Sequence, residues 1–261
     1  MRTYRITDTS EILSFQKSFV NDFPNCEIHR TNYTLKMKAG KEVHFYTAKM
    51  LGGRSFGVFK KIEKSVKNSG IEMPEIERGE IKYFRFANKT YPENFVIVDL
   101  SAAYPRSLLN MGYIDEEAYK ALMTLPKEAR LQVTGMLATQ KTVFHIENGI
   151  HINTEVKESE FRNVFFAACH TVGELLNECF EKFKKDALFY WVDGIGVKSE
   201  SAEKVLNFFI ERNYPAKLEQ VTNCRRVNNT IIFAKDGKRK ILFFPKKRKV
   251  TDLEILNFLK S

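Results

Sequence analysis

Two short apolar segments stand out along the chain because each leads to an acidic residue. Residues 95–100 (FVIVDL) and 187–192 (ALFYWV) are rich in β-branched and aromatic residues, which is typical of buried strands. Asp99 lies at the end of the first segment, and Asp193 directly follows the second. The pattern therefore predicts two buried strands that each carry a carboxylate to their end.

The remaining segments show either helical or strand periodicity. Apolar spacing predicts a long helix over 159–185, and Asn148-Gly149 is the two-residue turn expected of a hairpin within 141–155. Gly52-Gly53 predicts a turn. The order of elements indicates an α+β protein, with a mainly antiparallel sheet and helices packed on one face. Further helices are expected at 11–20, 56–68, 115–124, 127–139, 201–213 and 251–260, and further strands at 27–37, 42–47, 216–222, 229–234 and 239–244.

The charge balance points to a polyanionic partner. The 42 Lys and Arg residues against 32 Asp and Glu give a formal net charge of +10, which favours nucleic acid or an anionic membrane surface. No apolar run approaches the roughly 18–20 residues of a membrane span, so we expect no membrane partner. The four cysteines form no CxxC pair, which indicates reduced, buried thiols of a cytoplasmic protein.

Two carboxylates at strand ends suit a hard divalent cation. A charged Asp beside an apolar strand costs free energy unless its charge is compensated. Mg²⁺ prefers oxygen ligands and keeps some waters while it binds substrate phosphates. Two such ions about 3.5–4 Å apart activate an attacking hydroxyl and stabilise the leaving oxygen in phosphoryl transfer. The alternative is that both aspartates simply begin turns, where Asp is common.

The residues around both aspartates resemble motifs of family B DNA polymerases. VDLSAAYPRS, from Val98, is similar to the first palm motif, an Asp followed five residues later by Tyr-Pro. Asp99 falls on its metal-binding carboxylate. Tyr104 falls on the tyrosine that packs under the incoming sugar and excludes a 2′-hydroxyl. The resemblance also implies a metal contact from the Leu100 backbone carbonyl and a nucleotide contact from Ala103.

The third motif and the middle motif of the family are matched less completely. YWVDGIGV, at 190–197, is similar to the Asp-Thr-Asp run of the third motif and sets Asp193 on its second, metal-binding aspartate, while Trp191 replaces the first. In the middle motif, ARLQVTGMLA sets Arg130 on a lysine and Thr134 within an Asn-Ser pair. Both residues are thereby implied in nucleotide binding, and Arg130 would grip a triphosphate with a forked guanidinium.

Other segments resemble the protein-primed, bacteriophage branch of this family. LGGR at 51–54, with the hairpin at 141–155, is similar to a Gly-Gly segment that guides the template strand. The primer-gripping lysine of the family falls near Asn229, so neighbouring basic residues are expected to replace it. The implied nucleic-acid contacts are Gly52, Gly53, Arg54, Arg225, Arg226, Lys235 and Lys238.

The resemblance implies a fold and an organisation. We expect a polymerase palm at 95–250 with a small fingers insertion at about 115–140, preceded by an N-terminal α/β segment at 1–94. A short C-terminal helix at 251–261 leaves little or no thumb. No Asp-x-Glu signature precedes Asp99, so no proofreading exonuclease is expected. A palm without a thumb releases DNA easily and would synthesise short, distributive products.

The implied activity is template-directed DNA synthesis. The chain would add deoxynucleotides to a 3′-hydroxyl by a two-metal mechanism with Mg²⁺ or Mn²⁺, and protein side chains would supply position and charge. Its partners would be a DNA primer-template, dNTPs and a terminal or accessory protein that supplies primer or clamp. If the chain is phage-encoded, it would act in the cytoplasm of a bacterial host.

Two other interpretations remain open. Trp191, Thr134 and Leu137 stand where the family has other functional groups, so the chain is alternatively an inactive palm-fold protein that binds nucleic acid or serves as a replication scaffold. Reverse transcriptases also place an aromatic residue after their first Asp. YWVD lacks their paired aspartates, and the bulk of Tyr104 favours deoxynucleotides, so this third interpretation is the weaker one.

Overall fold

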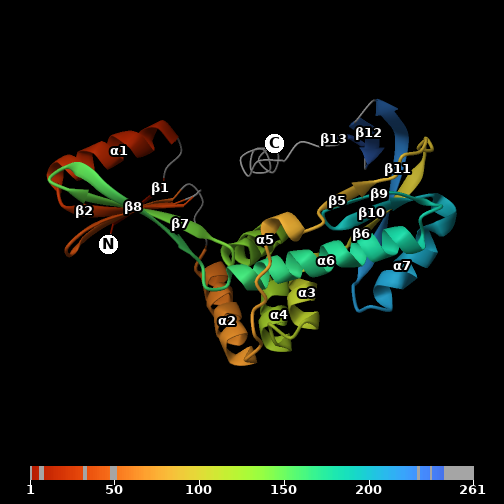
Figure 1. The fold of residues 1–261 in the computed structure, drawn as a ribbon, viewed down its shortest axis with the longest axis horizontal. Helices are drawn as coiled ribbons and strands as arrows, with labels where there is room; N and C mark the ends of the chain where they lie inside the picture. Colours follow the sequence, from red (N-terminus) through yellow and green to blue (C-terminus); the bar gives the residue numbers. More distant parts are fainter. Residues whose placement is uncertain are drawn as a thin grey trace. The chain divides into compact units, whose positions relative to one another are not determined.

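The fold, taken from a computed structural model, combines helices with two β-sheets (Figure 1). The expected α+β class with antiparallel sheets is confirmed, apart from one parallel pair of strands. The strands form two sheets where the sequence pattern predicts one, because periodicity defines strands but not their distant partners. The structure describes residues 2–5, 9–31, 34–47, 52–227, 230–235 and 237–243.

The chain divides into two compact units, and each takes two stretches of sequence. The first unit is Met1–Arg78 with Leu108–Ala168, and the second is Gly79–Ser107 with Cys169–Ser261. In this division residues 115–140, which were expected to be a fingers insertion in the palm, group with the N-terminal strands. The expected helix at 251–260 lies outside the described residues.

The first unit contains a six-stranded sheet in the order β1-β4-β3-β2-β7-β8. Helix α1 (Thr9–Asp22) lies across one face (Figure 1), where Phe19 packs in one core with Ile28 and Met37. The predicted hairpin is confirmed, with Asn148 and Gly149 at φ of 52° and 75° in its turn. The strands are β1 (Arg2–Arg5), β2 (Cys26–Arg30), β3 (Thr34–Ala39), β4 (Glu42–Thr47), β7 (Gln140–Glu147) and β8 (Ile150–Glu158).

A separate helical core completes the first unit. Val58, Ile62 and Val66 recur at helical spacing and are buried against the other helices. The Gly52-Gly53 turn prediction is wrong: Gly53 begins a helix and Gly52 is its N-cap, because the basic amphipathic segment begins earlier than expected. The helices are α2 (Gly53–Ser69), α4 (Glu116–Met123), α5 (Lys127–Met136) and the beginning of α6 (Arg162–Lys182).

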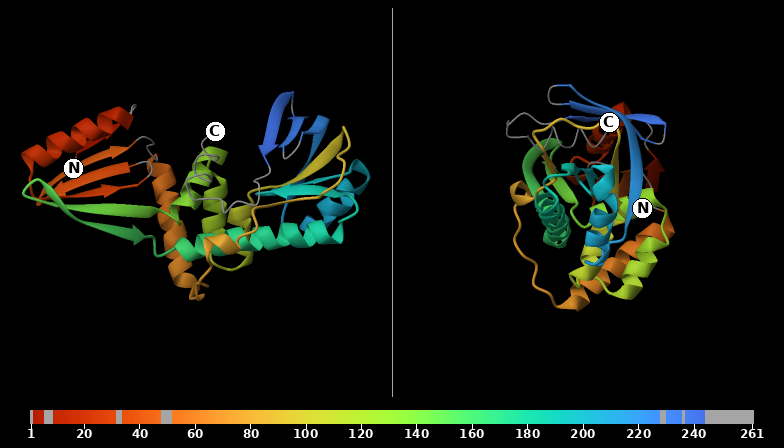
Figure 2. Two further views of the ribbon diagram at one scale, coloured as in Figure 1. Left: turned by 45° about the horizontal axis from the view of Figure 1, so that its top comes forward. Right: turned by 90° about the vertical axis from the view of Figure 1, so that its right-hand side faces the viewer.

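The second unit contains a seven-stranded, fully antiparallel sheet in the order β13-β12-β11-β6-β10-β9-β5. Helices α6 and α7 (Ala202–Ile210) lie along one face (Figure 1 and Figure 2), where Leu176 and Phe209 pack against Val98 and Ile195. The strands are β5 (Phe84–Phe86), β6 (Phe95–Leu100), β9 (Ala187–Trp191), β10 (Gly194–Val197), β11 (Ala216–Val227), β12 (Thr230–Lys235) and β13 (Lys238–Phe243).

The opposite face of this sheet, here called the open face, carries an aromatic cluster and the candidate chemistry. Alternation along β6 turns Val96 and Val98 toward the helices and Phe95 and Ile97 toward the open face. Asp99 therefore belongs to the open face. Residues 95–98 of β6 are all buried, so they are all apolar. This continuous apolar run is why the strand could be predicted from the sequence.

Several short elements escaped the sequence pattern. Helix α3 (Ala103–Asn110) and strands β5 and β10 were not predicted, nor were the short 3₁₀ turns Arg78–Glu80 and Ser199–Ser201. Strand β10 has the sequence GIGV, and glycine has low strand propensity. Its glycines are used for packing, since a Cβ on Gly196 would lie 2.6 Å from the Phe189 ring.

Two further expectations concern burial and membranes. All four cysteines are buried, as expected, and burial raises the pKa of Cys179 to about 12 and that of Cys224 to about 11. Among the helices of the described residues, none is both long and apolar enough to cross a membrane.

Two separate glycine substitutions test the packing of α6. In the Gly173→Ala variant the new Cβ would lie 2.7 Å from the backbone oxygen of Lys82, which a rotamer change cannot relieve. We expect the free energy of unfolding to fall by about 1–3 kcal/mol. In the control Gly135→Ala, on α5, the Cβ meets nothing within 4 Å. That variant should gain about 0.5–1 kcal/mol of helix propensity. Chemical denaturation would measure both, and equal effects would contradict the packing.

Candidate active site

Pairing of β6 with β10 brings the two aspartates to adjacent positions. The strands are antiparallel, and Gly194 lies directly opposite Asp99. Asp193 lies in the turn between β9 and β10, and its carbonyl accepts a hydrogen bond from the Leu100 amide at 2.9 Å. Two residues nearly a hundred positions apart are therefore backbone neighbours at one end of the sheet.

The turn that holds Asp193 is strained. Val192 has a φ of 56°, and the Asp193 amide donates to the Trp191 carbonyl at 2.7 Å, which closes a three-residue γ-turn. This form of the γ-turn is rare, and a β-branched residue in the left-handed region is an outlier. The Val192 amide donates to the Tyr83 carbonyl at 2.7 Å, which anchors the turn to the segment before β5. Strain of this kind clusters at functional sites.

A second left-handed residue follows Asp99. Ala102 has a φ of 54°, and its carbonyl accepts from the Arg106 amide at 2.9 Å as α3 begins. The Ser101 amide donates to the Pro215 carbonyl at 2.7 Å. The chain thus turns sharply after β6, and the first turn of α3 starts at the same end of the sheet. Both candidate aspartates stand next to backbone that ordinary residues avoid.

The Asp99 carboxylate lies in a row of charges on the open face. Its Oδ2 is 3.6 Å from Nζ of Lys217, which is directly opposite on β11. Lys217 also lies 2.6 Å from Glu219, which pairs in turn with Lys235. The hydrogen bond and the charge of Glu219, and after them the charge of Asp99, raise the pKa of Lys217. Burial alone would raise the pKa of Glu219, but the hydrogen bonds from both lysines outweigh it and lower that pKa.

The charge of Asp193 acts on Tyr104. Burial is the main cause that raises the pKa of Tyr104 well above its ordinary value, and the negative charge of Asp193 adds to the effect. Tyr104 is half-buried and packs against the core under the helices. Because Asp193 belongs to the turn, strand alternation does not assign it to a face.

The set of candidate metal ligands at this end of the sheet is small. The described residues contain no group of three or more His, Cys, Asp or Glu side chains that could hold a metal ion. Asp99 and Asp193 supply two hard carboxylates, and Mg²⁺ commonly binds through one or two carboxylates plus water and substrate phosphates. The Lys217 ammonium already lies beside Asp99, but its side chain is 57% exposed, and such a pair contributes at most about 1 kcal/mol.

Other sequence-predicted residues lie in the first unit. Thr134 and Arg130 are on α5, where the Thr134 hydroxyl is buried and donates to the Arg130 carbonyl at 2.9 Å. Arg130 donates to the Met123 sulfur at 3.5 Å. Gly52, Gly53 and Arg54 are at the N-terminus of α2. Their contacts with nucleotide and template stay predictions.

The remaining predicted residues lie in the second unit. Ala103 is buried in the core and Leu100 is the last residue of β6. Lys238 is exposed opposite Lys235 on the paired strands β12 and β13. Arg225 is exposed on β11. These placements leave the basic residues on the outer strands β11 to β13.

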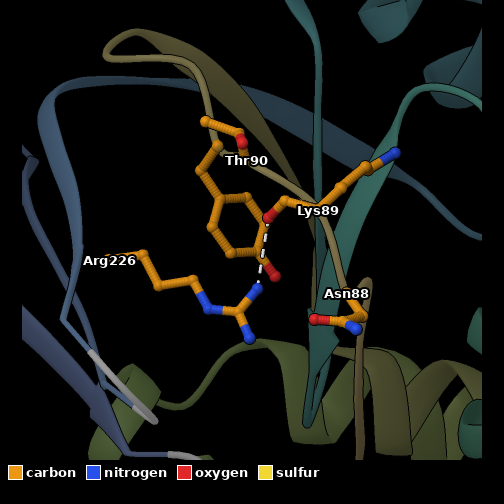
Figure 3. Close-up of a pocket in the computed structure, with 5 residues that line it drawn as sticks. Asn88, Lys89, Thr90 and Arg226 are labelled. Atoms are coloured by element: carbon orange, nitrogen blue, oxygen red, sulfur yellow. Dashed lines mark hydrogen bonds between the residues drawn. The ribbon is translucent and has the colours of Figure 1, made fainter.

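Arg226 has a structural use that the sequence did not indicate. It borders an open hollow of about 500 Å³ lined by residues 88–91, at the end of the sheet opposite Asp99. Its guanidinium donates to the Lys89 carbonyl at 3.1 Å (Figure 3). It also donates to the Ala87 carbonyl at 3.3 Å and lies over the Tyr91 ring. Arg226 therefore fastens this loop to β11, so its predicted role at the nucleic acid is not needed to explain its position.

Two neighbours of the candidate site were missed from sequence. Lys217 and Glu219 alternate in AKLEQV, so their common face was readable. Their position beside Asp99 follows from the pairing of β11 with β6, which the sequence does not reveal.

Comparisons with known proteins leave the family open. No protein-family model matches this sequence, and no curated protein matches it either. The likeness to family B polymerases therefore rests on the sequence motifs around Asp99 and Asp193.

The strain at Val192 is testable by mutation. Val192→Gly removes the side chain that disfavours a positive φ. We expect the free energy of unfolding to rise by about 1 kcal/mol, because the relief of backbone strain exceeds the conformational entropy that glycine loses on folding. The control Val156→Gly, at an exposed position of β8 without a positive φ, should be destabilising. Similar losses in both variants would show that the turn is unstrained.

Proposed function

We propose that this protein is a minimal DNA polymerase that adds deoxynucleotides to a 3′-hydroxyl. The observation that carries the proposal is that the backbones of Asp99 and Asp193 are neighbours across the β6–β10 pair, linked by the hydrogen bond from the Leu100 amide to the Asp193 carbonyl. An antiparallel sheet with helices on one face and two carboxylates at one end supports phosphoryl transfer better than any other chemistry on this chain.

The side chains at this end have separable roles in the proposed reaction. Asp99 and Asp193 would hold two Mg²⁺ ions, which when bound lower the barrier by activating the hydroxyl and neutralising the leaving pyrophosphate. Lys217 would leave Asp99 and turn to a phosphate, because its side chain is 57% exposed and an ammonium pairs with phosphate. Tyr104, half-buried beside Asp193, would form the wall against the sugar.

The finer features of the proposal follow from charge and packing. The net charge of +10 supports a polyanionic primer-template, and the lysines of β11 to β13 supply phosphate contacts on the open face. Packing of the bulky Tyr104 ring against the core under α6 and α7 supports selection of deoxynucleotides over ribonucleotides. A terminal or accessory protein would supply primer or clamp.

Primer extension tests the proposal. Purified protein with Mg²⁺ or Mn²⁺, dNTPs and a primed template should extend the primer. Asp99→Asn and Asp193→Asn each remove one ligand charge, and each should lower the rate by about 10²-fold or more.

The matched control is Asp186→Asn. Asp186 is also an aspartate beside β9, but it pairs with Lys198 and Ser201 at the other end of that strand. The variant should extend primers at close to the wild-type rate. Equal extension by the wild type and the Asp99→Asn/Asp193→Asn double variant would contradict the catalytic assignment.

One observation favours a second candidate, an inactive nucleic-acid-binding protein. Asp99 is already paired with Lys217, and the β9–β10 turn carries a single aspartate after Trp191. If the protein is of this kind, it should bind DNA tightly and in a salt-sensitive way, EDTA should not change the binding, and no nucleotide should be incorporated.

A further inference from the structure

One row of side chains crosses the open face at the candidate site. Strand pairing sets Phe84 opposite Trp191, Trp191 opposite Gly194, and Gly194 opposite Asp99, with Lys217 on the far side of Asp99. Residues directly opposite one another on neighbouring strands share a face. The row therefore runs from an aromatic pair through a glycine to the carboxylate and the lysine.

The aromatic pair forms a supported surface. The rings of Phe84 and Trp191 are stacked, with centroids 5.5 Å apart and planes inclined by 29°. Phe86 lies against both and also contacts Phe189, whose ring fills the space above Gly196. Phe84 remains 39% exposed. The buried cluster thus fixes the two rings while the outer one stays open to solvent.

Gly194 lets the carboxylate approach the aromatic pair. A Cβ at this position would lie 3.5 Å from Oδ1 of Asp99 and 3.3 Å from Cγ2 of Ile97. Asp99 therefore lies over the glycine, in the direction of Trp191. Gly194, which has no side chain, is the residue of this row between the Trp191 indole and the Asp99 carboxylate.

The other edge of the same face is basic. Lys238 is opposite Lys235, and Lys240 is opposite Phe233, a member of the open-face cluster. Lys238 and Lys240 are exposed. Aromatic rings at one edge and lysines at the other are the combination that binds single-stranded nucleic acid, since bases stack on rings and phosphates pair with cations.

We propose that Phe84 and Trp191 form a stacking platform for an unpaired nucleobase of DNA, held beside Asp99. The role of the platform rests on the proposed function, because the platform would hold a base at the end of the DNA strand that reacts. Stacking itself needs neither metal nor catalysis, so it can be measured without them. The chemical class of ligand is a base in single-stranded DNA, with its phosphates on the lysines of β11 to β13.

Trp191 is the only tryptophan of the chain, so its intrinsic fluorescence reports on the platform alone. The protein is titrated in EDTA with a short oligothymidylate and with an abasic oligomer of the same length. Both should bind through phosphates, as fluorescence anisotropy of labelled oligomers would show. Only the oligothymidylate should quench Trp191. Equal quenching by both, or binding of both without quenching, would overturn the platform.

Variants separate stacking from folding and from catalysis. Phe84→Ala and Trp191→Ala should each weaken oligothymidylate binding by about 5- to 150-fold and leave abasic binding unchanged. Trp191→Phe should restore most of the affinity. The control Phe56→Ala removes another exposed ring, 49% exposed on α2, and should change neither. Thermal unfolding monitored by circular dichroism would check that each variant folds.

The platform and the proposed polymerase can fail independently. Asp99→Asn should lose primer extension and keep the base-dependent quenching. Quenching without extension in the wild type would retain the platform and reject catalysis. Extension that survives Phe84→Ala and Trp191→Ala, with oligothymidylate affinity unchanged, would reject the platform and retain catalysis.

Discussion

The antiparallel pairing of β6 with β10 is the constraint on which the candidate site depends. It ends in the hydrogen bond from the Leu100 amide to the Asp193 carbonyl, which brings together two segments that are distant in sequence. The same pairing sets Gly194 opposite Asp99 and leaves room for the carboxylate. A one-residue change of register would turn Asp99 into the helix-packed core, where an uncompensated charge costs several kcal/mol, on the order of the total stability of a domain.

Strain and charge are concentrated at this end of the sheet, whereas the helix-packed face is apolar. Val192 and Ala102 hold left-handed backbone on either side of the paired aspartates. The buried core under α6 and α7 supplies the stability that tolerates such strain. The Lys217–Asp99 ion pair is weak, because the lysine side chain is 57% exposed and a solvent-screened pair is worth at most about 1 kcal/mol.

The sequence was sufficient for elements with strong local signals and insufficient for their pairing. The apolar run at 95–100, the long amphipathic helix and the Asn148-Gly149 hairpin each carry their own pattern, and all three are confirmed. The glycine-containing strand β10 carries no such pattern, and the Gly52-Gly53 turn is in fact a helix start. Lys217 joins the site only through strand pairing, which depends on contacts between distant segments.

The most direct test of the account is the position of bound divalent cations. Crystals of the protein soaked in Mn²⁺ would reveal them by anomalous scattering. We expect a Mn²⁺ peak in contact with carboxylate oxygens of both Asp99 and Asp193, with the Lys217 ammonium displaced from Asp99. Carboxylates turned to opposite faces of the sheet, with Lys217 still paired to Asp99 and no peak between the aspartates, would contradict it.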